Sequence, residues 1–146
     1  MSKTLKTVSQ IAKLLAKDSQ PILLSTIGLD GCPRSRYIGA FRIRDSAEIF
    51  LISMSNANKI KEIRKNSKVQ VILSDNDYKR VLTINGNASI VQDIDLRRTL
   101  YEETKPLKIY PVFNDNFGVI HFVPVQAEYL NLKVCNDPFV INILRH

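Results

Sequence analysis

Residues 21–44 decide the fold class, and they read PILLSTIGLDGCPRSRYIGAFRIR. An apolar run over 22–27 is followed by the pair Asp30 and Gly31, a strong hairpin signal because glycine readily adopts the positive φ that such turns need. A return strand is expected over 34–44. This segment therefore predicts an antiparallel β-hairpin near the start of the chain.

The rest of the chain continues as strands in consecutive runs. Apolar residues recur at helical spacing over 4–18, and further helices are expected over 57–66 and from Asp93, a good N-cap residue. The expected strands are 47–53, 69–74, 81–84, 117–125, 127–132 and 139–144. Because strands follow one another, the order favours a mainly β antiparallel barrel with peripheral helices over a doubly wound parallel sheet. We expect one domain over 1–146.

Composition excludes several classes of protein. The chain is 45% hydrophobic and 24% charged, as in ordinary globular domains. No apolar run approaches the ~20 residues that cross a bilayer, so no membrane contact is expected. The two cysteines, Cys32 and Cys135, lack metal-ligand spacing and suit a reducing compartment, so we expect a cytoplasmic protein without a metal site. No nucleophile–base constellation is visible, so an enzyme of this sequence would need a cofactor.

Positive charge is concentrated in the middle of the chain. The net charge is +7, and the segment from Arg34 to Lys68 holds nine basic and three acidic residues. Such an excess attracts an anionic partner, namely a phosphorylated small molecule, a nucleic acid or an acidic protein; the alternative is a solvated face. Nucleic acid is disfavoured because the segment's only aromatic residues are Tyr37, Phe41 and Phe50, and strand alternation assigns the first two to the core.

The basic residues of the return strand are expected to share one face. Alternation assigns Ser35, Tyr37, Gly39, Phe41 and Ile43 to the core, and it assigns the arginines to the opposite face. Those arginines are Arg34, Arg36, Arg42 and Arg44. Arginine matches phosphate bidentately, so this face is either an anion site or a solvated exterior with salt bridges.

A second basic feature lies where the strand over 47–53 leads into a helix. Lys59 falls in the first helical turn, where a cation is unfavourable unless an anion is near. Ser55 and Asn56 precede it and could be N-caps that need no ligand. Capping leaves the lysine unexplained, whereas a bound phosphate accounts for both features.

These residues, in this order, resemble the pyridoxamine 5′-phosphate oxidase-like flavoproteins, and more narrowly the general stress protein 26-like branch. The motifs that carry the resemblance are Pro33-Arg-Ser-Arg36, Ile52-Ser53-x5-Lys59, Val81-x-Thr-Ile-x-Gly86-x-Ala88 and Phe117-Gly-Val-Ile-His-Phe-Val-Pro-Val-x-Ala-Glu-Tyr-Leu130. The resemblance implies a split β-barrel that forms a homodimer and binds FMN at the subunit interface. It also implies that Arg36 and Lys59 meet the FMN phosphate, with Ile52 and Ser53 along the flavin.

The chain departs from the family pattern at three polar anchors, where it has Phe41, Asn58 and Val81. The chain also has no Trp, although the true oxidases carry a C-terminal Trp and Arg. We therefore expect an FMN-dependent oxidoreductase that acts on an unknown small molecule and is not a true pyridoxamine 5′-phosphate oxidase. The alternative is a non-catalytic stress or binding protein, or one with another cofactor such as a deazaflavin or heme. The family pattern also makes 80–91 one strand, although Asn85-Gly86 alone is typical of a hairpin turn.

Overall fold

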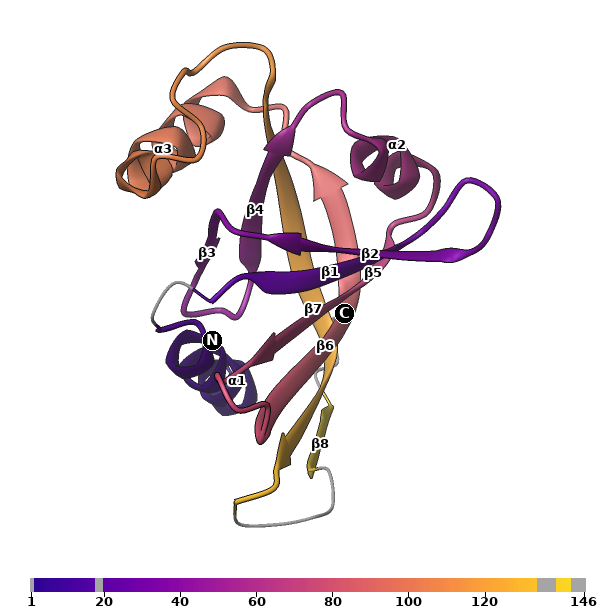
Figure 1. Ribbon diagram of the computed structural model, residues 1–146, viewed down its shortest axis with the longest axis vertical. Coiled ribbons are helices and arrows are strands. Elements are labelled where there is room, and N and C mark those ends of the chain that lie inside the picture. The colour runs from indigo at the N-terminus through magenta and orange to yellow at the C-terminus, as the bar shows by residue number, and fades with distance from the viewer. Residues whose placement is uncertain (1, 18–19, 134–138, 143–146) are drawn as a thin grey trace.

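The computed structural model describes residues 2–17, 20–133 and 139–142, and one strongly curled sheet dominates it (Figure 1). The helices are α1 (Lys3–Leu15), α2 (Asn58–Lys65), α3 (Ile94–Thr104) and the 3-10 turn η2 (Lys105–Leu107). The strands are β1 (Ile22–Ile27), β2 (Pro33–Ile38), β3 (Phe41–Ile43), β4 (Ile49–Met54), β5 (Lys68–Ser74), β6 (Arg80–Ile90), β7 (Phe117–Asn131) and β8 (Phe139–Asn142).

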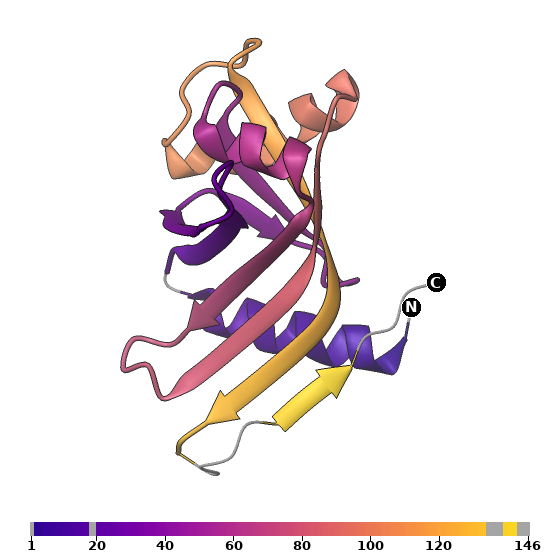
Figure 2. The same cartoon turned by 90° about the vertical axis from the view of Figure 1, so that its right-hand side faces the viewer.

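Within the described residues the strands form one antiparallel sheet in the order β2-β1-β5-β6-β7-β4-β3, and β8 pairs with β7. The long strands β6 and β7 bend, so the sheet closes into a half-barrel, and α1 crosses one end of it (Figure 2). The mainly β barrel with peripheral helices predicted from the sequence is confirmed. No helix of the described ranges is long and apolar enough to cross a membrane.

Two apolar clusters hold the sheet in this shape. The larger fills the barrel and includes Leu24, Val71 and Phe122, with one face of α1 packed against it. The smaller lies on the other side of β4 and β7, where Ile52 packs with Leu100 of α3. Strand β4 is buried on both faces, which explains why its sequence is a nearly continuous apolar run and does not alternate between apolar and polar residues.

The return strand expected over 34–44 is interrupted, and its face assignment is wrong before Phe41, although Phe41 and Ile43 do pack against the core as predicted. The strand breaks between β2, which ends at Ile38, and β3, which begins at Phe41. The Tyr37 side chain is 70% exposed, whereas Ile38 and Ala40 are 5% and 2% exposed. Arg36 pairs in register with the buried Leu24, so its side chain begins on the barrel side of the sheet. The arginines of this segment therefore do not share one face of one strand.

Gly86 lies within β6, as the family pattern predicts, and the hairpin interpretation of Asn85-Gly86 is wrong. The register between β6 and β7 shifts at this point, and β7 runs as one strand through the expected break after Val125. A Cβ on Gly86 would come within 2.2 Å of the Val123 carbonyl oxygen. Glycine is thus required here by the close approach of the neighbouring strand.

Candidate anion site at the start of helix α2

Helix α2 begins without a capping side chain. Its N-cap is Ala57, and its first turn contains no acidic residue. The hydroxyl of Ser55 instead donates to the carbonyl oxygen of Asp115 at 2.8 Å, so the alternative that Ser55 or Asn56 caps this helix does not hold. The positive end of the helix dipole therefore receives no negative charge from its own first turn.

Lys59 stands in that first turn, half-buried, and none of the described carboxylates lies within ion-pair distance of its ammonium group. Burial lowers the pKa of Lys59 from its ordinary value of 10.5, and the nearby positive charge of Arg36 lowers the pKa further, while Glu62 partly opposes this. The Lys59 and Arg36 side chains are therefore near enough to interact electrostatically. Two cations held close in a partly desolvated place favour an anion between or beside them.

Arg36 is held in place from one end of its guanidinium group. Its Nη1 donates to Thr26 Oγ1 at 2.8 Å, and its Nη2 donates to Glu62 Oε1 at 2.9 Å. The Nε group and the second Nη2 hydrogen have no acceptor among the described residues. One edge of the guanidinium is therefore occupied and the other is available for a bidentate contact.

Glu62 completes this network, although the sequence pattern predicts it on the outer face of the helix. Its side chain is 3% exposed and also lies 3.5 Å from Arg34 Nε. Arg34 forms a further ion pair with Asp30 at 3.2 Å, and a hollow of about 360 Å³ opens beside these residues. The three cations and two carboxylates of this network leave it with one net positive charge.

Ile52 and Ser53 lie at the end of β4, next to the loop that leads into α2, and both are buried. The Ile52 amide donates to the Ala40 carbonyl, and its own carbonyl accepts from the Tyr110 hydroxyl at 3.4 Å. The Ser53 hydroxyl donates to the Met54 carbonyl at 3.0 Å. Both residues are therefore occupied by internal bonds, and their contact with a flavin stays a prediction.

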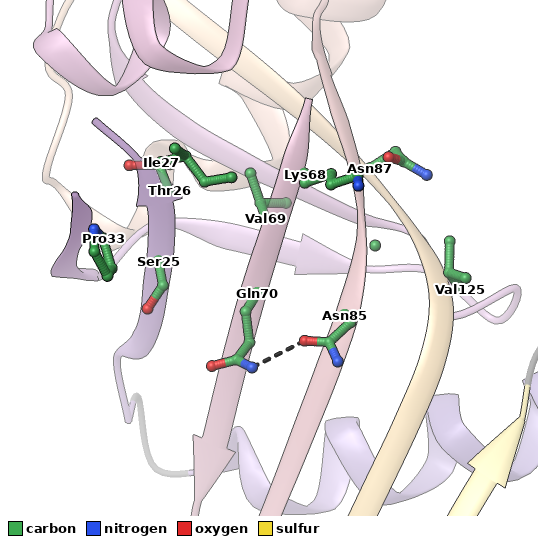
Figure 3. Close-up of a pocket in the computed structure, with 11 residues that line it drawn as sticks. Ser25, Thr26, Ile27, Pro33, Lys68, Val69, Gln70, Asn85, Asn87 and Val125 are labelled. Carbon is green, nitrogen blue, oxygen red and sulfur yellow. Dashed lines mark hydrogen bonds between the residues drawn. The ribbon is translucent and has the colours of Figure 1, made fainter. Parts of the chain in front are cut away.

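A groove of about 480 Å³ runs across the outer face of β1, β5, β6 and β7 (Figure 3). Gln70 donates to Asn85 across it at 2.9 Å, and Lys68 alone carries a charge among the described residues that line it. The sequence reasoning missed this groove. Apart from Lys68, the outward positions of β5 and of β6 beyond Arg80 carry no charge, which is unusual on the solvated face of a basic protein.

The positions that lack the family's polar anchors are occupied as follows. Phe41 packs against the barrel core, Asn58 lines the hollow beside Glu62, and Val81 is half-buried on β6. His121 is half-buried, and its Nε2 lies 2.9 Å from Glu48 Oε1. No group of metal-ligating side chains occurs in the part of the chain that the structure describes.

Comparison with known proteins decides the family. The family model described as pyridoxamine 5′-phosphate oxidase matches residues 8–130. The chain belongs to the pyridoxamine 5′-phosphate oxidase family. The split barrel and the family resemblance predicted from the sequence motifs are thereby confirmed. A search among curated proteins finds no match.

Several solved structures share the fold over most of this chain. General stress protein 26 from Bacillus anthracis superposes with a TM-score of 0.73 at 21% identity and covers 93% of this chain and 98% of its own. A protein related to general stress protein 26 from Clostridium acetobutylicum gives 0.74 at 15% identity and covers 94% and 96%. An F420 reductase gives 0.63 at 20% identity and covers 79% and 94%. The fold is thus shared with proteins described as general stress proteins and with an F420 reductase.

Proposed function

We propose that this protein is an FMN-dependent oxidoreductase that holds the FMN phosphate between Arg36 and Lys59. The observation that supports this most strongly is Lys59, a half-buried ammonium beside Arg36 with a lowered pKa and no ion-pair partner among the described carboxylates. A phosphate dianion would compensate both charges by charge-assisted hydrogen bonds. The uncapped start of α2 would add backbone N–H groups.

The residues of this site fit such a cofactor. The open edge of the Arg36 guanidinium suits two phosphate oxygens, and Lys59 Nζ supplies a point charge from the other element. Ile52 and Ser53 would lie along the ring system at the end of β4. FMN, when bound, supplies hydride and electron transfer. The protein's own part is then to bind, to orient and to keep water from the ring with apolar walls, while the small-molecule substrate is unknown.

A second copy of the chain would complete the site, as the family resemblance implies. The outer face of the sheet supports this, because Tyr37 is 70% exposed there and the neighbouring groove is lined by one charged residue, Lys68. Ser25 and Ser35 hydroxyls bond to each other at 2.7 Å on the same face. Uncharged polar and apolar surface of this kind is typical of the fully buried part of an interface.

A different cofactor is the second candidate. Phe41, Asn58 and Val81 replace polar anchors, so fewer contacts would hold FMN, and an F420 reductase shares the fold. The protein would then bind a deazaflavin or heme, or act as a stress-associated binding module without turnover.

The test is the cofactor content of the purified protein. Denatured protein should release FMN, identified by absorbance and fluorescence, or the apoprotein should take up added FMN in a saturable way. A colourless protein that does not bind added FMN contradicts the proposal. Saturable binding of F420, or a heme-type absorbance band on titration with heme, under the same conditions would instead favour the second candidate.

A further inference from the structure

The buried carboxylate of Glu62 is the feature that the proposed function does not use. Its exposure of 3% is exceptional for a glutamate, and removal of such a charge from water is costly unless it is paired and hydrogen-bonded. Glu62 Oε1 accepts from both Thr26 Oγ1 and Arg36 Nη2 at 2.9 Å, and Oε2 lies 3.5 Å from Arg34 Nε. Both carboxylate oxygens therefore contact arginine side chains, and one of these is Arg36 of the candidate site.

One of those partners, Arg36, is also a group that the phosphate would use, and the other phosphate ligand, Lys59, lies close to Glu62. Glu62 follows Lys59 by three residues on α2, so the two side chains are neighbours on one face of the helix. Arg36 reaches Glu62 from β2, on a different element. The Glu62 carboxylate consequently lies close enough to repel any anion that Arg36 and Lys59 bind.

We propose that Glu62 is a built-in counter-anion that occupies Arg36 and sets the site's affinity for a phosphate group. This inference rests on the proposed function for the identity of the ligand. Without Glu62, an incoming phosphate meets the full charge of Arg36 and Lys59. With it, the phosphate meets one charge fewer and a repelling carboxylate close by. The protein then binds its phosphorylated ligand weakly enough to exchange it.

If Glu62 had a purely structural role, its replacement would change the affinity for anions in the opposite direction. If Glu62 serves only to hold Arg36 in position, its loss disorders the guanidinium and weakens the binding of anions. If Glu62 acts as a counter-anion, neutralising it strengthens binding although the free protein becomes less stable. The variant Glu62→Gln separates the two roles, because an amide oxygen still accepts from Thr26 and Arg36 while the negative charge is gone.

The experiment compares wild type, Glu62→Gln and the control Glu102→Gln. Glu102 is exposed on α3, so the control changes the net charge equally at another element. Each protein is titrated with inorganic phosphate, followed by thermal shift, and with FMN, followed by flavin fluorescence. We expect Glu62→Gln to bind both ligands about tenfold more tightly than wild type, and Glu102→Gln to match wild type. Unchanged, weaker or absent phosphate binding by Glu62→Gln overturns the inference.

The two ligands keep this result separate from the proposed function. Tighter phosphate binding by Glu62→Gln without FMN binding by any variant supports the role of Glu62 and contradicts FMN as the ligand. If Glu62→Gln does not fold, Arg36→Met is compared with the double variant Arg36→Met/Glu62→Gln, which removes both charges of the buried pair and is better tolerated than loss of one. Phosphate should bind more tightly to the double variant, and equal, weaker or absent binding overturns the inference.

Discussion

Replacement of Lys59 by glutamine tests the candidate site through both binding and stability. Lys59 has no carboxylate partner within the described residues, so its removal breaks no internal ion pair. A charge-assisted hydrogen bond contributes about 1.5–3 kcal/mol, which corresponds to roughly 10- to 150-fold in affinity. Lys59→Gln should therefore weaken FMN binding by that factor and change riboflavin binding little, since riboflavin lacks the phosphate.

The same variant should stabilise the protein without ligand. Because burial and Arg36 lower the pKa of Lys59 in the folded state, protonated Lys59 disfavours folding at neutral pH. As the pH rises through the lowered pKa toward 10.5, the ammonium loses its proton and this disadvantage disappears. Lys59→Gln should thus be more stable than wild type near neutrality, and the difference should shrink at alkaline pH.

Fluorescence titration and denaturant unfolding measure the two effects, with Lys61→Gln as the matched control, because Lys61 is exposed on the same helix. The reasoning is refuted if FMN and riboflavin lose affinity equally in Lys59→Gln. It is also refuted if Lys59→Gln is less stable than wild type at neutral pH, or if its FMN affinity equals that of Lys61→Gln.

Three further variants test other parts of the structure. Gly86→Ala should destabilise the fold by roughly 3 kcal/mol in urea unfolding, because its Cβ would meet the neighbouring carbonyl at 2.2 Å; a loss near zero contradicts the close approach. Burial raises the pKa of Asp75, but hydrogen bonds from Arg80 outweigh it and lower the pKa from 3.8 to about 2, so the stability that this carboxylate contributes is lost as the pH falls through that range. The free energy of unfolding of Asp75→Asn should therefore fall less steeply with decreasing pH than that of wild type, and an equally steep fall in both proteins contradicts this. Tyr37→Asp should shift the protein from dimer to monomer, as measured by light scattering. A wild-type protein that is itself monomeric contradicts the proposed dimer interface.

Most of the fold could be predicted from the sequence because apolar periodicity and turn residues carry it. The helix from Asp93 is an example, since the Asp93 carboxylate accepts from the Asp95 and Leu96 amides as an N-cap should. The return strand over 34–44 could not be predicted correctly. The position where β2 ends depends on pairing with β1, and strand alternation alone assigns Tyr37 to the wrong face.

The candidate site, too, could be predicted from the sequence only in part. Lys59 could be singled out from the sequence because a cation at the start of a helix is unfavourable unless an anion is near, whereas the role of Arg36 came from the family resemblance. Glu62 was missed because helical periodicity treats a glutamate as outward-facing, while its burial is decided by Arg36 and Thr26 from two other elements. Its spacing of three residues from Lys59, within a segment short of acids, was the available signal.

A crystal structure of the protein with FMN tests the central claim most directly. The account predicts FMN phosphate oxygens within about 3 Å of both Lys59 Nζ and the open edge of the Arg36 guanidinium. A phosphate located away from the start of α2, with Arg36 and Lys59 both out of contact with it, would contradict the account.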